Sequence, residues 1–133
     1  ALALDDFARM LSQRGVVEVI HLGMYRGDLP LPRGKRLRHH VAALAIDVAA
    51  FVKAEGTRVI VQDDWHGRIG AQTCGERAQP WKPTPATVEL RELLCEAAGA
   101  KLFHQMLTPN HDRRHADHFH LEVMRDTSWM MVE

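Results

Sequence analysis

The segment from His118 to Met124 reads HFHLEVM, and polar and apolar residues alternate through its first six positions. Successive side chains of a β-strand point to opposite faces, so this spacing predicts a strand with a histidine face and an apolar face. The polar face carries His118, His120 and Glu122, and the apolar face carries Phe119, Leu121 and Val123. Because an unpartnered buried imidazole is costly, we expect the histidine face to form the floor of a polar cleft. Residues two apart on one face lie about 6.6 Å apart, so both rings can converge on a metal ion.

An isolated aspartate elsewhere in the chain offers a further metal ligand. Asp47 stands in the stretch RHHVAALAID among aliphatic residues, and an ionised carboxylate in apolar surroundings needs a cation. His40 precedes it by seven residues. On a helix that step returns to the same face, whereas if Asp47 lies in a strand, His40 must lie in the loop or bend before it. The spacing permits the two side chains to converge on one centre in either structure.

Length and charge limit the classes of function that the chain can have. Its 133 residues suffice for one domain with its own core, spanning residues 1–133. The 17 basic and 17 acidic residues balance, so we expect no nucleic-acid partner. No apolar run approaches the roughly 20 residues of a membrane span, and no signal peptide opens the sequence. We expect a monomer. Two cysteines, Cys74 and Cys95, leave one disulfide and two free thiols equally open.

Hydrophobic spacing and turn residues predict an α+β fold, with a small antiparallel sheet and flanking helices. The histidine face together with His40 and Asp47 adds the expectation of a zinc-containing cleft on the sheet, because imidazole nitrogens and carboxylate oxygens are zinc ligands. The second of two expected helices has Thr84 as its N-cap and Pro85 at its first position. The helices are expected over residues 4–15 and 84–100. Strands are expected over residues 16–25, 45–56, 57–64 and 118–124, although the alanines of the second strand also suit a helix. Residues 26–36 and 66–83 are expected to be irregular.

The spacing of His40 and Asp47, followed far downstream by HFH, resembles the H-x6-D and H-x-H signature of a zinc superfamily. That superfamily contains D-alanyl-D-alanine peptidases, lysostaphin-type endopeptidases and the hedgehog signalling domain. The chain more closely resembles the bacterial extensin-like C-terminal domain, whose pattern can be followed over roughly residues 16–124. The matching stretches are MYRG, RHHVAALAIDVAAF, LLCEAAG and HADHFHLEV. The chain departs from the family at Met24, Arg38, Ala43 and Glu122, where the family usually has Cys, Ser, Gly and Asp.

The resemblance implies one zinc per chain. Carried over residue by residue, it makes His40, Asp47 and His120 the ligands, which would lie at about 2.0 to 2.2 Å from the metal. Two imidazoles and one carboxylate leave a fourth position for water, as a catalytic zinc site requires. The implied protein is a zinc-dependent peptidase that hydrolyses stem peptides or cross-links of bacterial peptidoglycan, as an endopeptidase or a carboxypeptidase.

Three further residues are implied as candidates for proton transfer. The triplet His115, His118 and His120 is similar to the H-x-x-H-x-H motif of penicillin-insensitive murein endopeptidases. This similarity implies that His118 is the base, with His115 as a second candidate. Asp117 stands three positions before the last ligand, where carboxypeptidase relatives have a catalytic Glu. Strand alternation predicts that Asp117 points away from the metal side.

An arginine should hold a substrate carboxylate or the oxyanion, because its planar fork matches carboxylate geometry. Arg26, which follows the strand ending at Tyr25, is the first candidate. Arg38, two residues before a ligand, is the second, and Tyr25 joins them as a substrate-binding residue.

The resemblance also bears on the cysteines and on location. In the family a cysteine at the place of Met24 pairs with the counterpart of Cys95, so Cys74 is the remaining partner for a compensating bridge. Such a bridge would suit a periplasmic or secreted protein.

Two other function classes remain open. One is a non-catalytic zinc-binding interaction domain, as in the hedgehog relatives. The other is a metal-dependent nuclease of the His-Asn-His type, suggested by PNHDRRH. The nuclease would need a basic groove that the neutral charge balance does not supply, and it leaves His40 and Asp47 unexplained.

Overall fold

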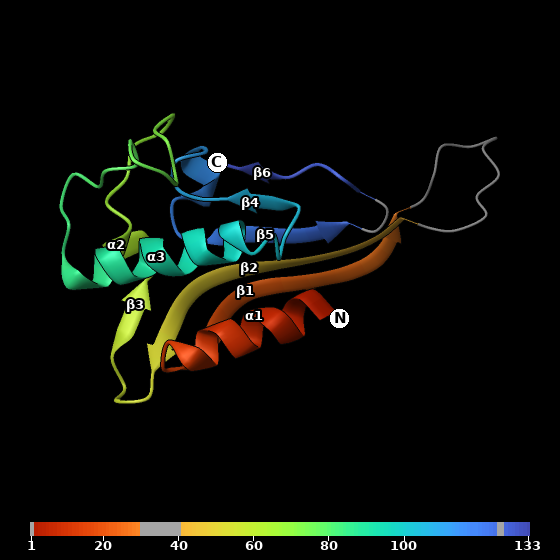
Figure 1. Cartoon of the computed structure of the whole chain (residues 1–133), viewed down its shortest axis with the longest axis horizontal. Helices are drawn as coiled ribbons and strands as arrows, with labels where there is room; N and C mark the ends of the chain where they lie inside the picture. Colours follow the sequence, from red (N-terminus) through yellow and green to blue (C-terminus); the bar gives the residue numbers. More distant parts are fainter. Residues whose placement is uncertain (1, 30–40, 125–126) are drawn as a thin grey trace.

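Two long antiparallel strands, β1 (Val16–Leu29) and β2 (Val41–Lys53), form one side of the sheet, with β1 at its edge (Figure 1). This computed structural model describes residues 2–29, 41–124 and 127–133. The sheet has the strand order β1-β2-β5-β4-β6, and β3 pairs with β2 beside this path. The shorter strands are β3 (Arg58–Ile60), β4 (Gln105–Leu107), β5 (Phe119–Met124) and β6 (Met131–Val132). Among the strands of the described residues, β4 and β6 alone pair in parallel, so the expected antiparallel sheet is confirmed in its main part.

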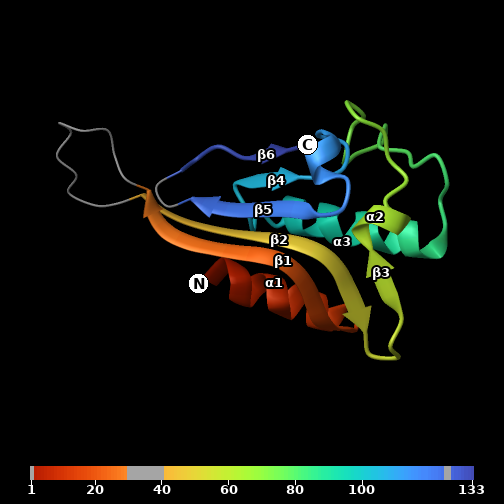
Figure 2. The ribbon, with the colours of Figure 1, turned by 180° about the vertical axis from the view of Figure 1, so that it is seen from behind.

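Two long helices, α1 (Leu2–Gln13) and α3 (Pro85–Gly99), lie on the same face of the sheet, as Figures 1 and 2 show from opposite sides. The N-cap of α3 is as predicted, because the Thr84 hydroxyl accepts a hydrogen bond from the amide of Thr87 and proline follows at the first helical position. Two shorter elements complete the helical structure: α2 (Val61–Asp64) and the 3-10 turn η1 (Arg113–His115). No helix in the described ranges is long and apolar enough to cross a bilayer.

The hydrophobic core fills the space between the helices and the sheet. On β5, Phe119 and Leu121 are buried while the residues between them are only partly covered, so the alternation read from the sequence is confirmed. Aromatic rings join the layers: Phe7 of α1 packs edge-on against Phe103 at 5.1 Å, and Trp65 packs edge-on against Phe119 at 5.3 Å. The opposite face of β5 is thereby left to polar side chains.

Three sequence-based expectations differ from the structure. β1 continues to Leu29, into the predicted loop 26–36, because its pairing with β2 persists to the Leu29 and Val41 pair. The predicted strand 57–64 ends at Ile60, and the chain turns into α2 because the Asp64 carboxylate accepts the Ile60 amide at 2.7 Å. The strands β4 and β6 were not predicted, and they are three and two residues long.

The second expected strand is confirmed, because residues 45–53 form a strand rather than the helix that their alanines also suited.

A buried polar contact anchors the loop that follows β4. Trp65 donates from Nε1 to the side-chain oxygen of Asn110 at 2.9 Å, and the Arg68 amide donates to the same oxygen at 3.0 Å. Arg91 of α3 donates twice to the Trp65 carbonyl and stacks over its ring at 4.3 Å. Burial lowers the pKa of Arg91 from its usual range. Gly67 lies so close to Trp65 and Asn110 that an added Cβ would overlap both side chains.

We therefore expect Gly67→Ala to lower the free energy of unfolding by about 1 to 3 kcal/mol, because the new methyl group must push apart a buried hydrogen-bonded pair. Gly99→Ala is the matched control, since a Cβ at the end of α3 meets no atom within 4 Å. That control should change stability by about 0.5 kcal/mol or less. Urea denaturation of both variants tests this, and equal stabilities for the two would contradict the packing argument.

The two cysteines form a disulfide that ties the irregular segment 66–83 to α3. Cys74 and Cys95 have an S–S distance of 2.02 Å and a Cα–Cα distance of 5.7 Å. No free cysteine occurs in the chain. The compensating bridge implied by the absence of a cysteine at Met24 is thus confirmed.

The bridge closes a loop with a sequence separation of 21 residues, for which chain-entropy arguments give about 3 kcal/mol of stabilisation. We expect the unfolded, unreduced protein to titrate with no free thiol. Reduction should lower the denaturation midpoint, and the double variant Cys74→Ala with Cys95→Ala should reproduce the reduced midpoint without responding to reductant. Two free thiols in the unreduced protein would contradict the bridge.

Candidate functional site

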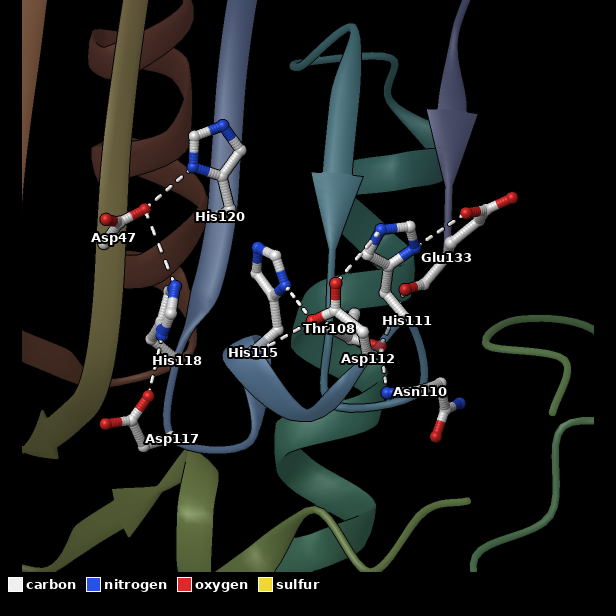
Figure 3. A network of polar contacts seen from close by, with 10 residues as sticks. All are labelled: Asp47, Thr108, Asn110, His111, Asp112, His115, Asp117, His118, His120 and Glu133. Carbon is white, nitrogen blue, oxygen red and sulfur yellow. Dashed lines mark hydrogen bonds and ion pairs between the residues drawn. The ribbon is translucent and has the colours of Figure 1, made fainter. Parts of the chain in front are cut away.

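The pairing of β2 with β5 places Asp47 directly opposite His120. Both side chains lie on the face of the sheet away from the helices (Figure 3). Nδ1 of His120 lies 2.8 Å from Oδ1 of Asp47. The ring of His118, just before β5, turns Nε2 toward the same oxygen at 3.9 Å. The ring of the predicted ligand His120 and the ring of the predicted base His118 therefore both face the carboxylate of Asp47.

Two more carboxylates contact the far sides of these rings. Nδ1 of His118 lies 2.8 Å from Asp117, on the other side of the ring from Asp47, as Figure 3 shows. Nε2 of His120 lies 3.3 Å from Glu122, the next residue on the same strand face. An ionised carboxylate can only accept hydrogen bonds, so the Nδ1 atom of His118 donates to Asp117. In the neutral ring, Nε2 of His118 then carries the lone pair, and this nitrogen is the one on the side of Asp47.

His115 brings a third imidazole to the cluster from η1. Its ring centroid lies 4.9 Å from that of His118 and 6.2 Å from that of His120. Oδ1 of Asp112, the residue that caps η1, lies 2.7 Å from Nδ1 of His115 and 3.2 Å from its amide nitrogen. The hydrogen bond from the His115 side chain is the main reason why the pKa of Asp112 is lowered.

The pair of Asp47 and His120 fits a zinc site in the chemistry of its donor atoms, a carboxylate oxygen and an imidazole nitrogen. Two donors on one tetrahedral zinc stand about 3.3 Å apart, so the observed 2.8 Å contact would have to widen by about half an ångström. Glu122 at the second nitrogen of His120 is the partner that metal-bound histidines commonly have. Within the described ranges, no set of three or more His, Cys, Asp and Glu side chains is placed to hold a metal. The third predicted ligand, His40, lies outside those ranges.

Of the three predicted substrate-binding residues, the structure describes the side chain of Tyr25 and not those of Arg26 and Arg38. Tyr25 lies on β1 with its side chain exposed, and its hydroxyl folds back over Gly23, whose strand partner is Asp47. Tyr25 thus lies beside the site, on the same face of the sheet. The backbone of Arg26 pairs with Leu44, and its side chain lies outside the described part of the structure. Arg38 also lies outside the described residues.

Three residues that were not predicted as site residues extend the cluster: His111, Asp112 and Glu133. Asp112 holds His115, and Oδ2 of Asp112 lies 3.7 Å from Nε2 of His111. Nδ1 of His111 contacts Glu133 at 2.8 Å, and both line a cavity of about 410 Å³ beside residues 70–74. The position of Asp112 three residues before His115 is the one signal in the sequence, because an N-cap acceptor reaches the third residue of its turn.

Comparison with known proteins identifies one family. The sequence profile described as "Extensin-like protein C-terminus" matches residues 2–132. No curated protein matches the chain significantly, and no solved structure does.

The contact between Asp112 and His115 predicts how the protonation of Asp112 depends on pH. Because the lowered pKa favours the ionised carboxylate in the folded protein, the contact contributes above the ordinary aspartate pKa of about 3.9 and is lost as pH falls through the lowered value. We expect the Asp112 side-chain carbon to titrate below pH 3.9 by NMR. In His115→Gln the titration midpoint should rise toward the ordinary value, and an unchanged midpoint would assign the shift to another cause.

Proposed function

The chain belongs to the extensin-like protein C-terminus family, and from this premise we propose that it is a zinc-dependent peptidase. Its substrates would be the peptide bonds of bacterial peptidoglycan, in stem peptides or cross-links. The observation that supports this proposal most directly is the register that sets Asp47 against His120 with the His118 ring on the same carboxylate. We further propose that the whole chain, residues 1–133, is one peptidase-like domain of the D-alanyl-D-alanine peptidase, lysostaphin and hedgehog superfamily.

The residues that would hold one zinc per chain are His40, Asp47 and His120. When bound there, zinc would lower the pKa of a water ligand toward about 7 and polarise a peptide carbonyl. Nδ1 is the atom of His120 that faces Asp47, so His120 would bind through Nδ1 once the proton that this nitrogen donates to Asp47 had been released to solvent. The N–H group at Nε2 would then donate a hydrogen bond to Glu122, and this bond would fix the orientation of the ring.

His118 is the proposed base. Asp117 fixes the proton of this ring on Nδ1, so Nε2 can accept a proton on the side of Asp47. The His118 side chain is 15% exposed, so part of the ring is accessible to solvent. Asp117 itself is half exposed and contacts the far nitrogen, so its position suits orientation of His118 more than direct attack. His115 stands 4.9 Å from His118 between ring centroids and is the second candidate for proton transfer.

Substrate contacts are proposed for Arg26, Arg38 and Tyr25. Tyr25 is exposed on the strand that lies next to Asp47, so its hydroxyl can reach a peptide laid across the face of the sheet. The two arginines would bind a carboxylate of the substrate or the oxyanion through their paired donors. Residues 26–36 and 66–83 flank the site in sequence and would set the choice of bond.

A periplasmic or secreted location is proposed, because the Cys74 and Cys95 bridge suits an oxidising compartment. The protein is proposed to act as a monomer. In the alternative function, a non-catalytic zinc domain, His118 would have a different role. If Nε2 of His118 became a fourth ligand, the site would be closed to water and the zinc would be structural.

Variants of His118 and His120 test the proposal. His118→Ala should keep one zinc per chain and slow muropeptide cleavage by about a hundredfold or more, because it removes the base and spares the ligands. His120→Ala should lose both zinc and cleavage. Metal analysis gives the zinc content, and mass spectrometry of digested muropeptides gives the rate and the bond that is cut. His21→Ala is the matched control, an exposed histidine of β1 whose loss should change neither quantity.

Chelator and an alternative substrate complete the test. Removing metal from the parent protein should abolish muropeptide cleavage, and added zinc should restore it. Nucleic acid incubated under the same conditions should remain intact. Full zinc with no cleavage in the parent would favour the non-catalytic domain. If His118→Ala cleaves as fast as the parent, His118 is not the base and His115 or Asp117 inherits the role.

A further inference from the structure

Asp112 makes two hydrogen bonds to one residue. Its Oδ1 atom accepts the backbone amide of His115 at 3.2 Å and faces Nδ1 of the same ring at 2.7 Å. The first bond caps η1, and a serine or threonine could make it equally well. The second bond needs an acceptor with the reach of an aspartate side chain, which serine and threonine lack. The second bond therefore requires an explanation beyond helix capping.

The contact with the ring decides where the His115 proton resides. Asp112 is ionised at neutral pH, since its pKa is lowered by the hydrogen bond from the His115 side chain, and an ionised carboxylate can only accept. Nδ1 of His115 must donate, so in the neutral ring Nε2 carries the lone pair. Figure 3 shows that this second nitrogen points away from Asp112, on the side of His118 and His120.

The Asp112 carboxylate is itself held from its other side. Its Oδ2 atom lies 3.7 Å from Nε2 of His111, whose Nδ1 contacts Glu133 at 2.8 Å. The rings of His111 and His115 pack edge-on at 5.4 Å between centroids. The carboxylate thus lies between two imidazoles with its own side chain 43% exposed, and the His115 side chain that it contacts is 15% exposed.

We propose that Asp112 is a positioning residue that holds His115 with its proton on Nδ1, so that Nε2 stays open as a second proton-transfer atom beside His118. The arrangement repeats the one at His118, where Asp117 contacts Nδ1 and Nε2 faces Asp47. The site then contains two Asp and His pairs that present the same ring nitrogen to one space. This inference rests on the proposed function for the role of His115, whereas the tautomer that it assigns stands without that function.

Two substitutions separate ring positioning from capping. Asp112→Ser keeps a side-chain acceptor for the His115 amide, but its hydroxyl is too short to hold the ring. Asp112→Ala removes both bonds. Asp117→Ser is the matched control, because it should release the His118 ring and leave His115 unchanged. All variants are made in the full chain and studied with zinc added and with chelator.

The first measurement is the tautomer of His115 by long-range proton and nitrogen NMR correlation, which distinguishes a protonated ring nitrogen from an unprotonated one. His115→Gln assigns the signals. We expect the parent to carry its His115 proton on Nδ1, and Asp112→Ser and Asp112→Ala to distribute it over both nitrogens. A parent proton on Nε2, or an Asp112→Ser spectrum identical to that of the parent at His115, would overturn the proposal.

The second measurement is muropeptide hydrolysis. Asp112→Ser should lower kcat by about ten- to a hundredfold, with KM and zinc content near those of the parent. A parallel loss of zinc or of folded protein would instead assign Asp112 a structural role and contradict the proposal. If the parent cleaves no muropeptide, the proposed function fails, but the NMR result still decides whether Asp112 positions His115.

Discussion

The antiparallel register between β2 and β5 is the constraint on which the rest of the site depends. It sets Asp47 opposite His120 and, on the neighbouring pairs, buries Val48 with Phe119 and Ile46 with Leu121. A slip of one residue would turn the polar set toward the helices and the apolar set toward the open face. The burial of the aromatic and aliphatic side chains therefore holds the carboxylate and the imidazole together. Stability and site geometry arise from one set of strand pairs.

The polar face depends in turn on carboxylates that fix each imidazole. Asp47, Asp112, Asp117 and Glu122 each contact a ring nitrogen within 3.3 Å. The rings of His115 and His118, each hydrogen-bonded to a carboxylate through Nδ1 alone, have a defined proton position, which an isolated surface histidine lacks. The same partners supply the negative charge that a cation at Asp47 and His120 would meet. The cluster is consequently an ordered network of carboxylates paired with imidazoles.

The loop that carries His111 to His118 is held in place by contacts with Trp65 and, through Trp65, with helix α3. Asn110 is buried at its start and is bound by Trp65, which in turn accepts two hydrogen bonds from Arg91 of α3. The disulfide ties the segment after Trp65 to the same helix. The site is therefore supported from α3 through the irregular segment 66–83, although that segment contributes no side chain to the histidine cluster.

The sequence by itself determined the elements whose signal is local. The alternation of residues 118–124 fixed which side chains share a face, and Thr84 with Pro85 fixed the start of α3, because these patterns depend only on neighbouring residues. Only the tertiary structure decided the partners. β4 and β6 are too short to carry a periodic signal and exist because β5 and β4 offer them edges. The extension of β1 to Leu29 depends on β2, and the contact of Asp112 with His115 depends on a turn that the spacing permits but does not require. Pairing between distant segments is set by the packing of the whole chain, which no local pattern encodes.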